Sequence, residues 1–163
     1  MGNWYTKANE QAIISKIKNI LKTSKLCIDL MQYYNIPVSD IDNHLTIEIR
    51  QLDDKFAEGN SSTIFLDEKL FNGDFFNDNF HFVIHEFFHW VKRRSEKDFY
   101  FNDPEEIQSF TLAITWQLSH GKCEDFIRKT IFPIVQPHFK DQNEAQKLFE
   151  QMLSEAKRLV SME

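Results

Sequence analysis

The segment HFVIHEFFHW contains histidines at positions 81, 85 and 89, with Glu86 between the last two. Residues four apart share one face of an α-helix, so the imidazoles of His85 and His89 can bind the same metal ion. Zinc is the natural ion for such a site. Glu86 projects about 100° away around the same turn, so it can act as general base on a water molecule at the ion without binding the ion itself.

A catalytic zinc site usually has three protein ligands, and the downstream candidates for the third are Glu105 and Glu106. Both lie at the start of the next predicted helix. If the apolar residues between 107 and 118 form one buried stripe, Glu106 lies roughly 85° from its centre and Glu105 nearly opposite. We therefore expect Glu106 to be the ligand and Glu105 to face water. The alternative for Glu106 is a capping box, in which its side chain bonds the backbone of Asp103.

Two other interpretations fit the same residues. In one, the chain binds a metal ion but serves as a regulatory or structural protein without turnover. In the other, His85 and His89 are core histidines of a phenylalanine-rich helical interaction module that binds no metal. Metal content separates the second interpretation from the first, and a catalytic assay separates the first from an enzyme.

The other histidines have less defined roles. His81 can line the same site, or it can simply begin the helix near Asp78. A hydrolase also needs a group that stabilises the oxyanion. The sequence does not choose among the candidates His44, His120, His138 and Tyr100.

The elements that position these side chains follow from the spacing of apolar residues. Residues 8–34 have helical periodicity, with Ser24 as the cap of a second helix, and Pro37 lies beyond the end. The segment 44–67 first alternates apolar and polar residues and then contains the run TIFLD, 63–67, so it predicts a small antiparallel or mixed sheet.

Helices are predicted for the rest of the chain. The active-site helix covers 77–94, and a glutamate-bearing helix covers 104–120, where Pro104 suits the first helical position. The C-terminal helices lie within 122–160. The sequence thus predicts an α+β fold in a single domain over 1–163.

Composition narrows the classes of function. Apolar residues make up 42% of the chain and charged residues 27%, which is typical of a folded globular protein. The net charge of -6 argues against a nucleic-acid partner, and no apolar run approaches the ~18 residues of a membrane span. Cys27 and Cys123 are far apart, without metal or redox spacing, so we expect no disulfide framework and a cytoplasmic location. The oligomeric state stays open.

The motif HEFFH followed by PEEIQSF resembles the compact glutamate-type zincins, or minigluzincins, a group that includes ImmA/IrrE-type and small phage-like peptidases. The resemblance implies a zincin-like fold in which HExxH lies on one helix and a ligand glutamate on the next. It implies zinc as cofactor, with His85, His89 and Glu106 as ligands and Glu86 as catalytic base.

The same resemblance implies a zinc metallopeptidase that hydrolyses peptide bonds in a protein or peptide substrate. In such folds an edge strand beside the metal pairs with the extended substrate. The resemblance assigns this role to residues 63–67, because backbone pairing of that kind suits polypeptides.

Overall fold

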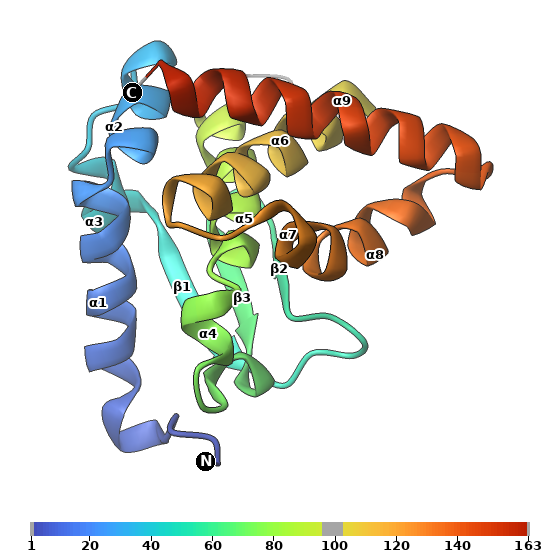
Figure 1. Cartoon of the computed structure of the whole chain (residues 1–163). Helices are drawn as coiled ribbons and strands as arrows, with labels where there is room; N and C mark the ends of the chain where they lie inside the picture. Colours follow the sequence, from blue (N-terminus) through green and yellow to red (C-terminus); the bar gives the residue numbers. More distant parts are fainter. Residues whose placement is uncertain (1, 96–102, 163) are drawn as a thin grey trace. The chain divides into compact units, whose positions relative to one another are not determined.

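The computed structural model describes residues 2–95 and 103–162, which belong to two compact units, Met1–Tyr100 and Phe101–Glu163. The fold is α+β, with a small mixed three-stranded sheet packed on helices (Figure 1). This confirms the predicted fold class at that level. The prediction of a single domain stays a prediction.

The first unit begins with helices that the apolar periodicity predicts. A short 3-10 turn, Lys7–Asn9, leads into α1, Glu10–Thr23, and α2 follows as Lys25–Tyr33. Ser24 separates the two helices, as predicted, although its side chain makes no capping hydrogen bond. The stripe that α1 buries consists of Ile13, Ile14, Ile17 and Leu21.

A short helix that the sequence analysis missed, α3, covers Asp40–His44 just before the sheet. Its five residues are too few for a helical period to be detected. Asp40 accepts a hydrogen bond of 3.0 Å from the guanidinium of Arg94.

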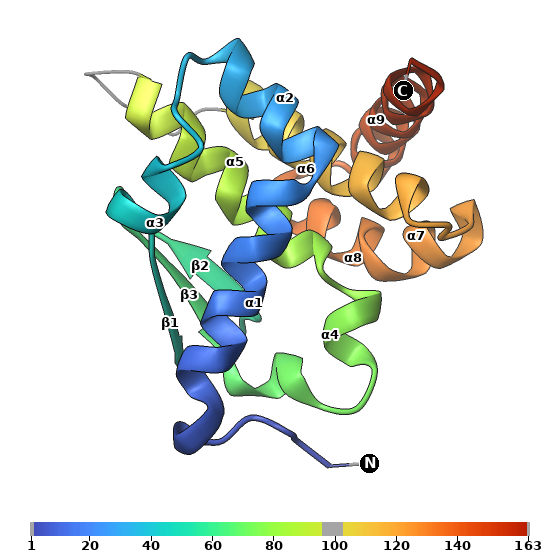
Figure 2. The ribbon, with the colours of Figure 1, turned by 90° about the vertical axis from the view of Figure 1, so that its left-hand side faces the viewer.

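The sheet consists of β1, Thr46–Arg50, β2, Ala57–Gly59, and β3, Thr63–Asp67, in the order β1-β3-β2 (Figure 2). β1 pairs with β3 in parallel, whereas β2 pairs with β3 antiparallel. The predicted alternation in β1 is confirmed, because its isoleucines are buried and its polar residues exposed. The register places these residues on one face of the sheet: Ile47, Ile49, Ala57, Gly59, Ile64 and Leu66.

The opposite face of the sheet contains a row of three side chains, one from each strand. The guanidinium of Arg50 lies 3.9 Å from the centroid of the Phe65 ring and 3.7 Å from the carboxylate of Glu58. Arg50 is exposed, and the other two side chains are half-buried. We call this the Arg50–Phe65–Glu58 row.

The expectation that residues 63–67 form the edge strand is wrong, because β3 is the central strand. β3 pairs with β1 on one side and with β2 on the other. The three residues of β2 are too few to show alternation in the sequence. The backbone N–H of Asp67 donates to the Phe56 carbonyl across this pair. Antiparallel residues alternate in pairing, so the N–H and C=O groups of Ala57 and Gly59 are directed away from β3. The side of β2 that faces away from β3 is therefore an edge at which another strand could pair.

The helix that contains the HExxH motif is shorter than predicted. A separate turn, α4, covers Phe75–Asp78, and α5 covers His81–Ser95, so the predicted helix over 77–94 is interrupted. The reason is Asn79, whose backbone leaves helical geometry (φ -128°, ψ 31°). Its side-chain amide donates to the Phe75 carbonyl at 3.0 Å, which stabilises the end of α4.

The second unit consists of helices: α6, Asp103–Ser119, α7, Glu124–Thr130, α8, Phe132–Val135, a 3-10 turn at Gln136–His138, and α9, Gln142–Ser161. The glutamate helix and the last helix agree with the predictions, and Asp141 caps α9 by accepting from Asn143 N–H. The first part of the predicted C-terminal helical region, 122–160, consists of two short helices, because α7 ends at Thr130 and Pro133 lies in the first turn of α8. The side chains of Asp103 and Pro104 lie outside the described part.

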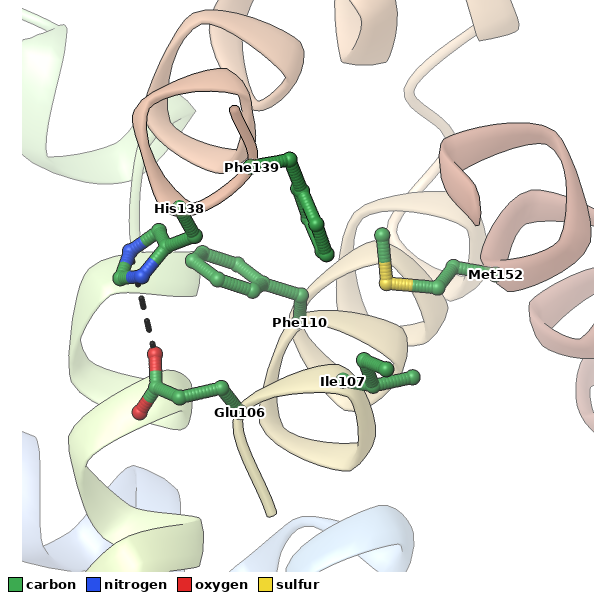
Figure 3. A pocket seen from close by; sticks show the side chains of 6 residues that line it. All are labelled: Glu106, Ile107, Phe110, His138, Phe139 and Met152. Carbon is green, nitrogen blue, oxygen red and sulfur yellow. Dashed lines mark ion pairs between the residues drawn. The ribbon is translucent and has the colours of Figure 1, made fainter. Parts of the chain in front are cut away.

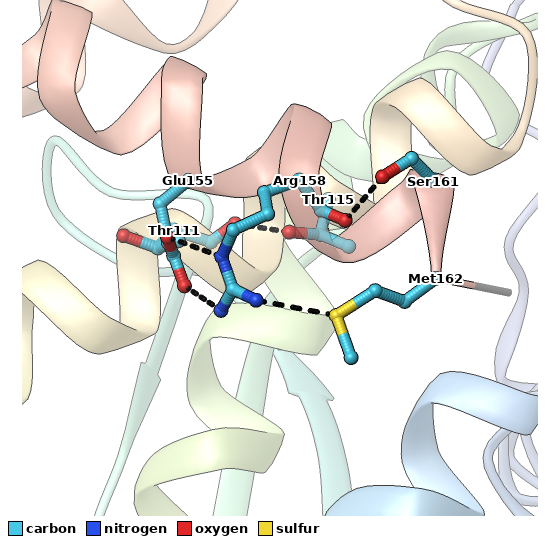
Figure 4. Close-up of polar contacts among 6 residues, drawn as sticks. All are labelled: Thr111, Thr115, Glu155, Arg158, Ser161 and Met162. Carbon is cyan, nitrogen blue, oxygen red and sulfur yellow. Dashed lines mark hydrogen bonds and ion pairs between the residues drawn. The ribbon is translucent and has the colours of Figure 1, made fainter.

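The core of the second unit forms where α6 and α9 pack together. Its members are Phe110, Ile114, Ile127, Ile131, Val135, Phe149, Met152, Leu153 and Ala156. Near the end of α9, Arg158 bonds Glu155 and the sulfur of Met162, and the Thr115 hydroxyl of α6 donates to the Thr111 carbonyl (Figure 4).

Within the described ranges, no helix combines the length and apolar character needed to cross a membrane.

Candidate metal centre

The histidines of α5 lie along one face of the helix, one turn apart. The ring centroids of His85 and His89 are 4.9 Å apart, with an angle of 71° between the ring planes. His89 is buried, and His85 is half-buried. The predicted helical placement of the pair is confirmed, and the two imidazoles are close enough to bind one ion.

The next face of α5 packs on the sheet. The ring of Phe82 lies 5.1 Å from that of Phe56, which precedes β2. One turn further along α5, the carboxylate of Glu86 lies against Gly59 of β2, so close that a Cβ on this glycine would be 2.9 Å from Glu86 Oε2. Glu86 is half-buried. The Glu86 carboxylate therefore lies at the edge strand of the sheet, and Glu86 directly follows His85 in the sequence.

His81 begins α5, as one of the two interpretations predicts. It is 2% exposed, and its Nε2 lies 3.2 Å from Asn79 Oδ1. Because the Asn79 amide nitrogen donates to Phe75, its oxygen faces the imidazole, so His81 Nε2 is the donor. Burial is the main cause that lowers the pKa of His81 to about 3, and the proximity of His85 contributes to this shift in the same direction. His81 is thus neutral at physiological pH.

Glu106 lies on α6 in the second unit and is half-buried. Its Oε2 is 3.9 Å from Nε2 of His138, and the His138 ring contacts Phe110 edge to face at 5.4 Å (Figure 3). These residues belong to a small pocket lined by Glu106, Ile107, Phe110, His138, Phe139 and Met152. His138 therefore has a defined neighbour, although the sequence shows no motif around it.

The expectation that Glu105 faces water is wrong, because this side chain is 4% exposed. The prediction assumed that α6 buries a single stripe. The structure shows a second buried series, in which Ser109, Ala113 and Trp116 continue the helix face that begins at Glu105. A helix that is buried on several faces does not reveal from its own sequence which side is solvated.

The remaining oxyanion candidates are in different settings. His44 is exposed at the end of α3, with its Nε2 3.9 Å from Asp40. His120 stacks on Trp116 at 4.0 Å and donates from Nδ1 to the Trp116 carbonyl. Tyr100 lies outside the described residues. The structure assigns the oxyanion role to neither His44 nor His120.

Among the described residues, His85 and His89 of the first unit and Glu106 of the second have side chains of the types that can bind a metal ion. Gly59, which lies against the Glu86 carboxylate, is not among the site residues predicted from the sequence. A glycine within a strand often marks a close approach by another group, but β2 is too short to be recognised as a strand from the sequence. His138 likewise offers no signal in the sequence.

No family model, curated protein or solved structure matches the chain.

Proposed function

We propose that this chain is a zinc-dependent peptidase of zincin-like fold, in which His85, His89 and Glu106 hold the ion and Glu86 is the general base. The observation that carries the proposal is the arrangement on α5. Two imidazoles lie 4.9 Å apart, and the carboxylate beside them lies at the edge of β2. Metal ligands, a base and a place for extended peptide thus occur together.

The donor set fits zinc. Two imidazoles and one carboxylate are a common set for catalytic zinc, and they are less suited to calcium or magnesium, which prefer oxygen ligands alone. When bound, zinc supplies a Lewis acid that polarises the scissile carbonyl and lowers the pKa of water.

Glu86 performs the proton transfers. A carboxylate oxygen of Glu86 accepts a proton from the attacking water and then delivers it to the nitrogen of the leaving amine. The position of Glu86 supports this role, because it follows the ligand His85 directly but lies on the helix face toward β2. Glu86 is therefore next to the ligand His85 in the sequence but lies on a different face of the helix.

The edge of β2 supports a polypeptide as substrate. The backbone groups of Ala57 and Gly59 directed away from β3 can pair with an extended peptide in antiparallel or parallel fashion. Recognition of this kind depends on main-chain hydrogen bonds, which every peptide offers. The proposed substrate class is therefore an unfolded or extended segment of protein.

Glu86→Gln tests the mechanism directly. The amide keeps the shape of the side chain but does not accept a proton, so we expect cleavage to fall by at least about 100-fold, in the range of general acid–base effects. Cleavage is measured on a library of fluorescence-quenched peptides, and zinc content is measured by elemental analysis. The variant should retain as much zinc as the wild type.

The controls separate the three interpretations. If wild type holds about one equivalent of zinc but cleaves no peptide and no unfolded protein, the chain is a metal-binding protein without turnover. If wild type purified from zinc-replete medium holds less than about 0.2 equivalents, the metal site is wrong, because such sites normally retain their ion. Full activity of Glu86→Gln would contradict the assignment of the base.

A further inference from the structure

Gly59 is a residue of β2 that strand geometry does not explain. Glycine is unfavourable within a strand, because it loses more backbone entropy on folding and contributes no side chain to packing. The described glycines with positive φ are Gly73 and Gly121, so Gly59 does not adopt a backbone conformation that requires glycine. Another constraint must favour glycine at this position.

The constraint is the approach of Glu86. The register places Gly59 opposite Ile64, on the sheet face that carries the buried isoleucines. A Cβ at this position would lie 2.9 Å from Glu86 Oε2, and 3.4 Å from the Thr63 carbonyl oxygen. The second distance is close to ordinary van der Waals contact. The first is not, so the carboxylate occupies the space that a side chain would need.

We propose that Gly59 is a positioning residue for Glu86. By lacking a side chain, it lets the carboxylate lie directly against the β2 edge, where the proposed peptide would pair. The inference rests on the proposed role of Glu86 as general base. It assigns to one strand residue the placement of that base relative to the substrate.

A Cβ at position 59 should affect catalysis more than stability. The oxygen that a Cβ would displace is at the end of a flexible side chain, so the carboxylate can move by about 0.5 Å at small cost to stability. A catalytic group must be held within about 0.5 Å of its productive position, and a misplacement of about 1 Å can cost 100-fold in rate. Gly59→Ala should therefore impair catalysis while leaving the fold intact.

The first experiment compares Gly59→Ala with wild type on the same quenched peptides. We expect kcat to fall at least about 10-fold, KM to change little and zinc content to stay the same. Gly2→Ala is the matched control, because a Cβ there meets nothing within 4 Å. It should behave as wild type.

The second experiment does not depend on activity. Thermal unfolding is measured for metal-free wild type, Gly59→Ala, Glu86→Ala and the double variant. We expect Gly59→Ala to raise the unfolding temperature more when Glu86 is alanine than when it is glutamate, because the displaced carboxylate is then absent. The contact with the Thr63 carbonyl is the same in both backgrounds and cancels.

The outcomes distinguish the two proposals. If wild type cleaves peptide and Gly59→Ala retains full kcat, the inference is overturned and the peptidase assignment stands. If wild type lacks both zinc and cleavage, the peptidase assignment fails, and the thermal comparison still reports whether Gly59 and Glu86 are coupled. Equal thermal shifts in the two backgrounds would overturn the contact itself.

Discussion

Glu105 and Glu106 are adjacent in the sequence, but their side chains have different environments. Glu105 is 4% exposed, whereas the Glu106 side chain is 20% exposed and has His138 nearby. A carboxylate at either position could serve as a third ligand in chemical terms. The proposed zinc site uses Glu106, which the sequence resemblance predicts as the ligand.

Replacement of each glutamate by glutamine tests this assignment. We expect Glu106→Gln to weaken zinc binding by more than about 100-fold, because the loss of a ligand should exceed the 10–100-fold effect of an outer-shell partner. Glu105→Gln should have a smaller effect on zinc binding. Affinity is measured by competition with a chromophoric chelator.

Thermal unfolding of both variants is the control for structural damage, since Glu105 is the more buried side chain. A larger loss of zinc affinity in Glu105→Gln, at equal stability, would show that the ligand is Glu105. Equal losses would place the metal ion away from this pair.

At the residue scale, the sequence predicts relations within one helix better than relations between elements. The common face of His85 and His89 follows from a spacing of four, because helical geometry is local. The burial of Glu105 does not follow, because it depends on what surrounds α6. The contact between Glu86 and Gly59 depends on the packing of α5 on β2, which no spacing within either element records.

At the element scale, Asp67 connects three segments of the first unit. It is the last residue of β3 and is 1% exposed. Its carboxylate accepts hydrogen bonds from Leu52 N–H at 2.6 Å and from Lys69 N–H at 2.7 Å. These bonds connect β3 to the loop that follows β1 and to the 3-10 turn Glu68–Phe71.

Asp67→Ala should destabilise the protein by about 3 kcal/mol, because two partly buried N–H groups lose a charged acceptor and such bonds contribute about 1.5–3 kcal/mol each. The free energy of unfolding is measured by urea denaturation. Asp53→Ala is the matched control, because this aspartate is exposed in the loop after β1. It should change stability by less than about 0.5 kcal/mol. Equal effects of the two variants would mean that the Asp67 bonds contribute nothing.

The elements that the sequence predicts well are those with a long, regular pattern. The alternation in β1 and the helical periodicity of α1 extend over several residues, and both predictions hold. β2 has three residues and no pattern, so its existence, and with it the central position of β3, could not be predicted. The break between α4 and α5 depends on one residue, Asn79, which the surrounding phenylalanines do not reveal.

At the scale of the whole molecule, stability depends on keeping His81 neutral. Burial lowers its pKa to about 3, against an ordinary value of about 6.5 in an unfolded chain. The unfolded state therefore binds a proton that the folded state does not bind between these values. Stability from this group is complete above about pH 6.5 and is lost as pH falls toward 3.

Metal-free wild type should accordingly lose about 1.4 kcal/mol of unfolding free energy per pH unit below 6.5 from His81 alone. Because carboxylates also titrate in this range, the test is a difference between proteins. Urea unfolding is measured at pH 7, 5.5 and 4.5 for wild type and His81→Gln. The variant keeps a donor but has no imidazole, so its stability should fall less steeply. Parallel pH dependences would show that His81 does not contribute.

The described residues fall into two compact units, and the prediction of a single domain stays a prediction. The boundary lies at residues 100 and 101, within a segment that has no run of glycine, proline or serine typical of a linker. Length also favoured one domain, since 163 residues suffice for a single core. The extent of a compact unit depends on contacts between residues that are distant in the sequence, and composition does not predict such contacts.

The Arg50–Phe65–Glu58 row affects how the protein behaves at high concentration. It covers an aromatic ring on the sheet face opposite the buried isoleucines, and its own two charges remain hydrated. Another copy would have to remove water from both charges before its apolar groups could touch Phe65. Stacking of two such sheets is thereby disfavoured, and aggregation through this face is suppressed.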